Sequence, residues 1–151
     1  MGHPNEPNRK QTILIDSDAF VAFVKADDSN HARAVELFNH LEHLPVVFVT
    51  SNYVFAEAIT VISQRVGHEV AIEFSQTLQS GQGIVRIRYA DKELDKWALD
   101  IFKKQSSKNT SFVDCANMAL LQTEHIPYIF SFDAVYKANG YRTVEALVAA
   151  A

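Results

Sequence analysis

The chain has 151 residues, of which 48% are apolar and 21% are charged, and these values predict one domain with a packed core and exclude a disordered protein. Eighteen acidic and fourteen basic residues give a formal net charge of −4, which argues against a protein that holds nucleic acid by bulk positive charge alone. An enzyme whose acidic residues hold a metal ion is still compatible with that charge.

Short apolar runs rich in β-branched residues alternate along the chain with longer stretches of helical periodicity. In chain order the pattern predicts a strand at 12–15, a helix around 34–41, a strand at 45–50, helices at 52–66 and 68–80, a strand at 84–88, a helix around 94–101, a helix that opens at Ser111, and a strand at 127–131. Gly67 predicts the break between the two central helices, and Ser111 and Asp114 match a capping box.

Strands that alternate with helices are joined by right-handed crossovers and form a mostly parallel sheet with helices on both faces. We therefore expect a three-layer α/β/α sandwich, with a single domain over residues 12–147 after a flexible leader at residues 1–11. The larger aromatic side chains are expected in its core: Phe20, Phe23, Phe38, Phe48, Phe55 and Trp97.

The cellular compartment of the protein is predicted from the membrane-spanning and signal segments that the sequence does not contain and from its cysteine content. No apolar run approaches the roughly 20 residues that span a membrane, and the N-terminal stretch has no signal-peptide core. Cys115 is the single cysteine, which excludes an intrachain disulfide framework and is typical of a reducing compartment. We expect a cytoplasmic protein with no membrane contact.

Acidic residues follow the predicted strands at the edge where ligands bind to open parallel sheets. Asp16 and Asp18 come after the first strand, Asp133 comes after the last, and Asp114 lies in the first turn of a helix. Glu57 stands alone in an apolar helical stretch, where a buried carboxylate requires a partner.

Each acid also has a purely structural interpretation. Asp16 and Asp114 are suited to cap helices, and Asp133 is suited to a turn or a cap. Glu57 can reach solvent from the edge of its helix. The joint pattern of four acids at positions that a parallel sheet gathers is what favours a site.

Carboxylates crowded at one site repel one another and become protonated unless a cation holds them together. No lysine or arginine is close in sequence to Asp16, Glu57 or Asp114. Oxygen ligands alone suit Mg²⁺ or Mn²⁺ rather than zinc. Such a site hydrolyses phosphodiesters by polarising the phosphoryl group and activating a water molecule.

Four segments in order carry a resemblance to the PIN-domain family: ILIDSDAFVAF with Asp16, NYVFAEAITVI with Glu57, SFVDCANMALL with Asp114, and FSFDAVY with Asp133. The resemblance implies a Mg²⁺- or Mn²⁺-dependent ribonuclease in which these four acids bind the metal, with Glu57 as a ligand or as the group that orients the attacking water. The short chain also resembles VapC-type toxins, which implies a homodimer that acts on RNA and is silenced by a small antitoxin protein.

Three other functions are compatible with part of this pattern. A PIN nuclease of RNA processing would need the same acids. The pair Asp16 and Asp18 also resembles the start of DxD-type phosphatases, but that class does not explain Glu57. A non-catalytic RNA-binding PIN module would lack an acid, and none is missing. The roles of Asp18 and Asn117 stay open, and no lysine or arginine is assigned to RNA.

Overall fold

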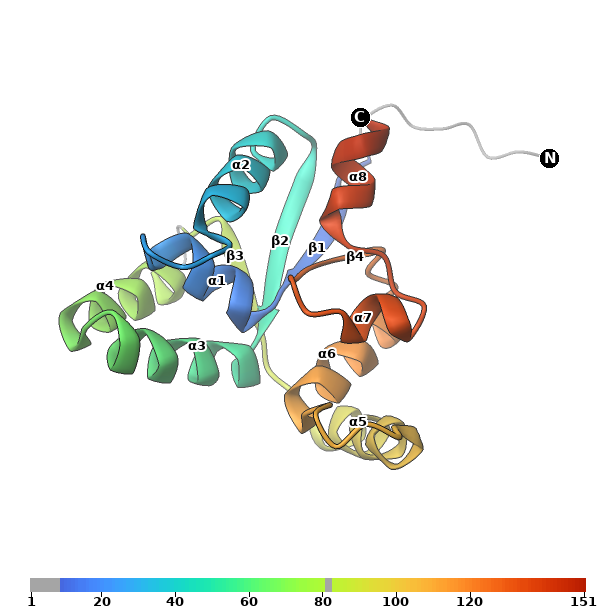
Figure 1. The fold of residues 1–151 in the computed structure, drawn as a ribbon. Coiled ribbons are helices and arrows are strands. Elements are labelled where there is room, and N and C mark those ends of the chain that lie inside the picture. The colour runs from blue at the N-terminus through green and yellow to red at the C-terminus, as the bar shows by residue number, and fades with distance from the viewer. Residues whose placement is uncertain (1–8, 81–82) are drawn as a thin grey trace.

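The structure is a computed structural model that describes residues 9–80 and 83–151. One sheet holds four parallel strands in the order β3-β2-β1-β4 (Figure 1). The strands are β1 (Gln11–Ile15), β2 (Val46–Ser51), β3 (Val85–Arg88) and β4 (Tyr128–Phe130). The helices are α1 (Ser17–Val24), α2 (His31–Leu41), α3 (Asn52–Arg65), α4 (His68–Gln79), α5 (Lys92–Lys104), α6 (Phe112–Thr123), α7 (Val135–Ala138) and α8 (Val144–Ala150).

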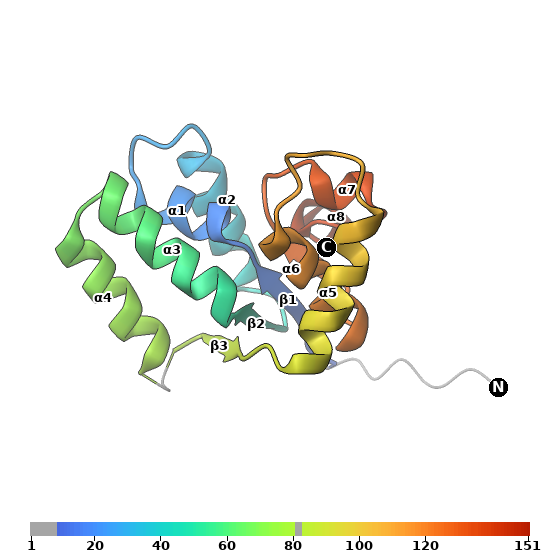
Figure 2. The same cartoon turned by 90° about the horizontal axis from the view of Figure 1, so that it is seen from below.

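Helices cover both faces of the sheet, as Figure 2 shows for α1 to α4 on one side and α5 to α7 on the other. Successive side chains of a strand point to opposite faces. Ile13 and Ile15 accordingly pack with residues of α1, α2, α3 and α8. Leu14, between them, packs with residues of α6 and α7. The predicted three-layer α/β/α sandwich is confirmed.

The predicted leader lies mostly in residues 1–8, which are outside the described part of the chain, and β1 begins one residue earlier than expected, at Gln11. Gly67 lies between α3 and α4 as predicted, with a φ of +154° that side chains with a Cβ rarely adopt. No helix within residues 9–80 and 83–151 is both long and apolar enough to cross a membrane.

Two aromatic residues expected in the core lie at the surface. Trp97 is 44% exposed, because α5 packs on α6 through the small residues Ala98 and Ala116, which leaves the large ring outside. Phe23 is 45% exposed at the wall of an open apolar groove. Helical spacing predicts which residues share a face of a helix, but not how much of that face a neighbour covers.

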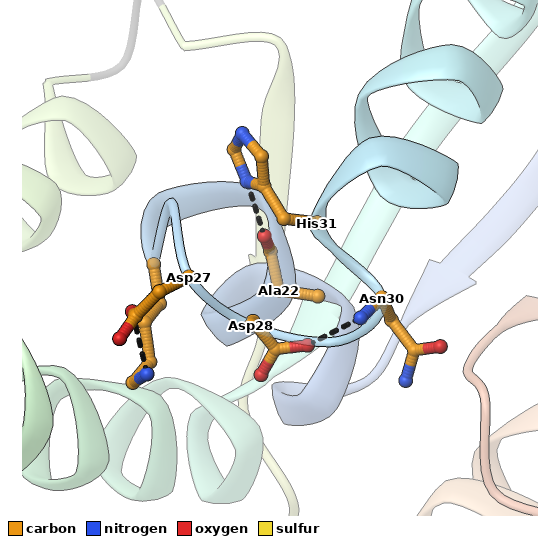
Figure 3. A network of polar contacts seen from close by, with 6 residues as sticks. Ala22, Asp27, Asp28, Asn30 and His31 are labelled. Atoms are coloured by element: carbon orange, nitrogen blue, oxygen red, sulfur yellow. Dashed lines mark hydrogen bonds and ion pairs between the residues drawn. The ribbon is translucent and has the colours of Figure 1, made fainter.

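The chain reverses between α1 and α2 through a separate network of polar contacts (Figure 3). His31 Nδ1 donates to the carbonyl oxygen of Ala22 at 2.8 Å, and Asp28 Oδ1 accepts from the backbone nitrogen of Asn30 at 2.8 Å. Lys25 forms an ion pair with Asp27. Each of these contacts pairs a side chain with a nearby backbone group or charge, and together they fix the loop that leads into α2.

The carboxyl ends of β1 and β4 meet at one edge of the sheet, where Ile15 is opposite Phe130. The backbone nitrogen of Asp16 donates to the carbonyl oxygen of Phe130 at 3.0 Å. The residues that follow these two strands are therefore neighbours in space, although more than a hundred residues separate them in sequence.

Candidate active site

Asp16 is the centre of the acidic site. It caps the N-terminus of α1 and is only 4% exposed. Its Oδ1 accepts hydrogen bonds from the backbone nitrogen of Ser17 at 2.8 Å and from Asn117 Nδ2 at 3.1 Å. Its Oδ2 accepts from Tyr136 Oη at 2.9 Å and from Ser131 Oγ at 3.1 Å. Groups from α1, α6 and α7, together with the residue that follows β4, thus fix one carboxyl group.

Burial, together with the charge of Asp18, raises the pKa of Asp16 from its ordinary 3.8 to about 7. Asp114 adds to this shift, whereas the hydrogen bonds from Ser17 and Tyr136 lower the pKa of Asp16. Within the described residues, no lysine or arginine forms an ion pair with any of the three aspartates. The site therefore holds more negative charge than its protein surroundings compensate.

Tyr136 joins Asp16 to Asp114. Its side chain is completely buried on α7, and its hydroxyl lies 3.3 Å from Asp114 Oδ1 as well as 2.9 Å from Asp16 Oδ2. The same hydroxyl accepts from Asn117 Nδ2 at 2.9 Å. Burial and the two carboxylates raise the pKa of Tyr136. Its single proton is consequently retained and lies between two acids.

Asp114 also closes the predicted capping box. Its Oδ2 accepts from the backbone nitrogen of Ser111 at 2.9 Å, and Ser111 Oγ accepts from the backbone nitrogen of Asp114 at 3.0 Å. Only Oδ1 of Asp114 is directed at Tyr136. The capping and site interpretations of this residue are compatible, because an ionised carboxylate has two acceptor oxygens.

Asp18 belongs to the same network. Its Oδ2 accepts from the backbone nitrogen of Phe132 at 2.8 Å and from Ser131 Oγ at 3.1 Å. Its Oδ1 is buried and has no hydrogen-bond partner within the described residues, and the same holds for Asn117 Oδ1. Burial raises the pKa of Asp18.

Glu57 and Asp133 lie at the rim. Glu57 is exposed, so the interpretation that it reaches solvent from the edge of its helix is the one that holds; α3 turns this position away from the core. Its Oε2 accepts from Ser17 Oγ at 2.9 Å, one residue from Asp16. Asp133 is also exposed, and its Oδ1 accepts from the backbone nitrogen of Val135 at 2.9 Å, as the turn interpretation predicted.

The available ligand atoms fit a divalent cation. The acids offer oxygen ligands only. Two buried oxygens among the described residues, Asp18 Oδ1 and Asn117 Oδ1, have no hydrogen-bond partner. However, no three Asp, Glu, His or Cys side chains within residues 9–80 and 83–151 lie close enough together to form a metal-binding group. The hydroxyls of Tyr136 and Ser131 bridge the carboxylates instead. Metal binding at the four acids stays a prediction.

Sequence reasoning did not identify Tyr136 and Ser131. The sequence does contain a signal for Tyr136, which follows Asp133 by three residues. A buried tyrosine needs a hydrogen-bond partner for its hydroxyl, and the nearby acids could supply one. Ser131 ends the last predicted strand and offered no such signal.

Residues 13–140 match the sequence model of the PIN domain, and the chain therefore belongs to the PIN-domain family, as the resemblance indicated. It is similar to the 23S rRNA-specific endonuclease VapC20 of Mycobacterium tuberculosis from two strains, with 27% identity over 129 residues that cover 85% of this chain and 95% of VapC20. The crystal structure of VapC20, described as a sarcin–ricin loop cleaving toxin, matches this fold with a TM-score of 0.77 at 26% identity and the same coverage.

Proposed function

We propose that the chain is a Mg²⁺- or Mn²⁺-dependent endoribonuclease that hydrolyses RNA phosphodiester bonds at the acidic site. The observation that carries this proposal is the buried carboxyl of Asp16, which shares hydroxyl donors with Asp18 and Asp114 and forms no ion pair with a lysine or arginine among the described residues. RNA as substrate is supported by the similarity to VapC20, which is described as an rRNA endonuclease.

In this proposal Asp16, Asp114 and Asp133 hold the cation, and Glu57 at the rim orients the attacking water. A bound cation would polarise the phosphoryl group and lower the pKa of that water. Tyr136 keeps the carboxyl groups of Asp16 and Asp114 side by side. The Ser17 hydroxyl fixes Glu57 next to Asp16.

The purified protein is expected to cleave a labelled RNA hairpin with Mn²⁺ and to leave it intact with EDTA. Asp114→Asn should slow cleavage at least about 100-fold, because metal-ion catalysis supplies several kcal/mol of transition-state stabilisation. Denaturing gels with time points measure both rates. Turnover of p-nitrophenyl phosphate without RNA cleavage would favour the phosphatase interpretation, and RNA binding without any turnover would favour the non-catalytic module.

We further propose a toxin role. The similarity to VapC20 supports it, and a hairpin with the sarcin–ricin loop sequence is the substrate to test first. Induced expression should arrest bacterial growth, and expression of Asp114→Asn should not. Normal growth with an active, soluble wild-type enzyme would instead favour a PIN nuclease of RNA processing.

The proposed antitoxin has a candidate docking surface. An apolar groove of about 600 Å³ lies between α1, α2, α4 and the start of β3. Phe23 and Phe74 line it, and Ile84 at its edge is 69% exposed. Glu42 and Glu73 line the same groove. This combination fits an amphipathic segment that inserts apolar side chains and places lysine or arginine near the two glutamates.

Phe23→Glu is expected to abolish neutralisation by a small protein encoded beside the gene while RNA cleavage is kept, because the charge would enter an apolar groove at the opposite end of α1 from Asp16. Trp97→Glu is the matched control, since Trp97 on α5 is equally exposed. Growth on co-expression is the measurement, and equal neutralisation of the two variants would contradict this docking surface.

The predicted homodimer needs its own test. A single species near 16.9 kDa in sedimentation velocity would contradict it.

A further inference from the structure

A polar pocket of about 480 Å³ lies next to the acidic site, between the α5–α6 loop and α7. Asp133, at the rim of the acidic site, also lines this pocket, so the pocket adjoins that rim. The volume is within the roughly 300–1,000 Å³ of ordinary ligand pockets. An RNA strand whose phosphate reaches the acids has room to extend past Asp133 into this pocket.

Amide and hydroxyl side chains dominate the pocket wall. Gln105 Nε2 donates to Asn139 Oδ1 at 3.1 Å and ties the loop to α7. Asn139 Nδ2 donates to the carbonyl oxygen of Val135 at 2.8 Å, which fixes the orientation of that amide. The backbone nitrogen of Asn109 donates to Ser107 Oγ at 3.2 Å, while within the described residues no hydrogen bond holds the Asn109 side chain. The pocket thus has a wall held by hydrogen bonds and one side-chain amide, that of Asn109, whose donor and acceptor can contact a base edge.

Four lysines lie in the two chain segments that form this pocket. Lys104 lines it, Lys108 is in the same loop, and Lys103 and Lys137 are adjacent along the chain. All four are exposed, and within the described part of the chain none of them is in an ion pair, whereas Lys96 on the same α5 helix pairs with Glu93. Unpaired lysines beside an acidic centre can neutralise the phosphates that flank the reacting one.

We propose that this pocket binds an unpaired nucleotide of the RNA substrate beside the bond to be cleaved. Lys104 and Lys108 contact its phosphates, and the Asn109 amide contacts the edge of its base. Unstacked nucleotides present base edges that amides can read, whereas an RNA duplex hides them. The inference rests on the proposed ribonuclease function and adds to it a substrate of single-stranded form and a site for base preference.

Binding is tested without catalysis, with fluorescent single-stranded RNA decamers in EDTA. The double variant Lys104→Ala/Lys108→Ala should weaken binding about tenfold or more and lower the slope of log affinity against log salt by about 0.7 for each lysine. The control Lys92→Ala/Lys96→Ala removes the same charge from the far end of α5 and should bind like the wild type. Equal loss in the two double variants would overturn the pocket.

Base contact is tested with the four homopolymer decamers. The wild type should prefer one base, and Asn109→Ala should flatten that preference while the salt dependence stays unchanged. A wild type without preference would overturn base recognition, and equally tight binding of an RNA duplex would overturn the unpaired-nucleotide assignment.

Cleavage with Mn²⁺ separates this inference from the proposed function. The lysine double variant should cleave the long RNA more slowly and a dinucleotide at the wild-type rate. If the wild type cleaves no RNA but binds it through these lysines, the proposed ribonuclease function is wrong and the proposed nucleotide pocket stands. If the wild type cleaves RNA but the lysine double variant binds RNA as tightly as the wild type, the proposed nucleotide pocket is wrong and the ribonuclease function stands.

Discussion

Asp16→Asn is expected to slow RNA cleavage strongly and at the same time to stabilise the metal-free protein. The loss of a charged ligand should lower the cleavage rate about 10²- to 10³-fold, since transition-state stabilisation by a metal is worth several kcal/mol and about 1.4 kcal/mol corresponds to tenfold. Stability should rise because the substitution removes a buried charge that forms no ion pair within residues 9–80 and 83–151. About 1 kcal/mol corresponds to roughly 2–4 °C in Tm for a chain of this size.

The amide fits the site without orphaned groups. Its oxygen can replace Asp16 Oδ1 as acceptor for Ser17 and Asn117, and its nitrogen can donate to the hydroxyls of Ser131 and Tyr136, which then act as acceptors. A hydroxyl reverses its role freely, and the substitution therefore tests charge and not packing.

The pH dependence of stability follows from the same carboxyl group. Because the pKa of Asp16 is about 7 in the folded chain and 3.8 ordinarily, the folded state binds more protons than the unfolded state between these values. The free energy of unfolding of the metal-free protein should therefore fall as the pH rises from about 4 to about 7. Thermal unfolding in EDTA should show this decline for the wild type and a weaker one for Asp16→Asn. A lower Tm for the variant at pH 7 would contradict the charge argument.

The strands could be predicted from the sequence because buried parallel strands are short runs of β-branched residues with clear boundaries. Each predicted strand end lies within one residue of the observed one. The capping box at Ser111 and the break at Gly67 are local signals of the same kind. Helix α7 has four residues, too few for a periodic pattern.

The acids could be proposed as a site for a different reason: parallel strands bring their carboxyl ends to one edge whatever the details of packing. The groups that connect these acids could not be predicted from the sequence. Ser131 and Tyr136 are 115 and 120 residues from Asp16 in sequence, and no local pattern pairs residues at that separation. The exposure of Glu57 likewise depends on how α3 is rotated against the sheet, and this is decided by the whole core.

Tyr136→Phe is expected to lower the cleavage rate about 10- to 100-fold while the fold is kept. The hydroxyl acts through Asp16 and Asp114 and is therefore a positioning group, and losses of this size are typical for partners that orient metal ligands. Its removal should also raise the pKa of Asp16 further, because the Tyr136 hydrogen bond lowers it. The acid limb of the pH–rate profile should consequently move to higher pH, and half-maximal activity should require more Mn²⁺.

Tyr141→Phe is the matched control for this variant. The Tyr141 hydroxyl accepts a hydrogen bond from Gln122 Nε2, which belongs to the exposed end of α6 and contacts no acid of the site. It should leave the pH–rate profile and the Mn²⁺ requirement unchanged. A merely structural role of Tyr136 predicts a lower Tm with an unshifted profile, so a parallel loss of rate at every pH would contradict the positioning role. A shift of the acid limb in Tyr136→Phe alone identifies the hydroxyl as one of the groups that lower the pKa of Asp16, beside the Ser17 backbone nitrogen.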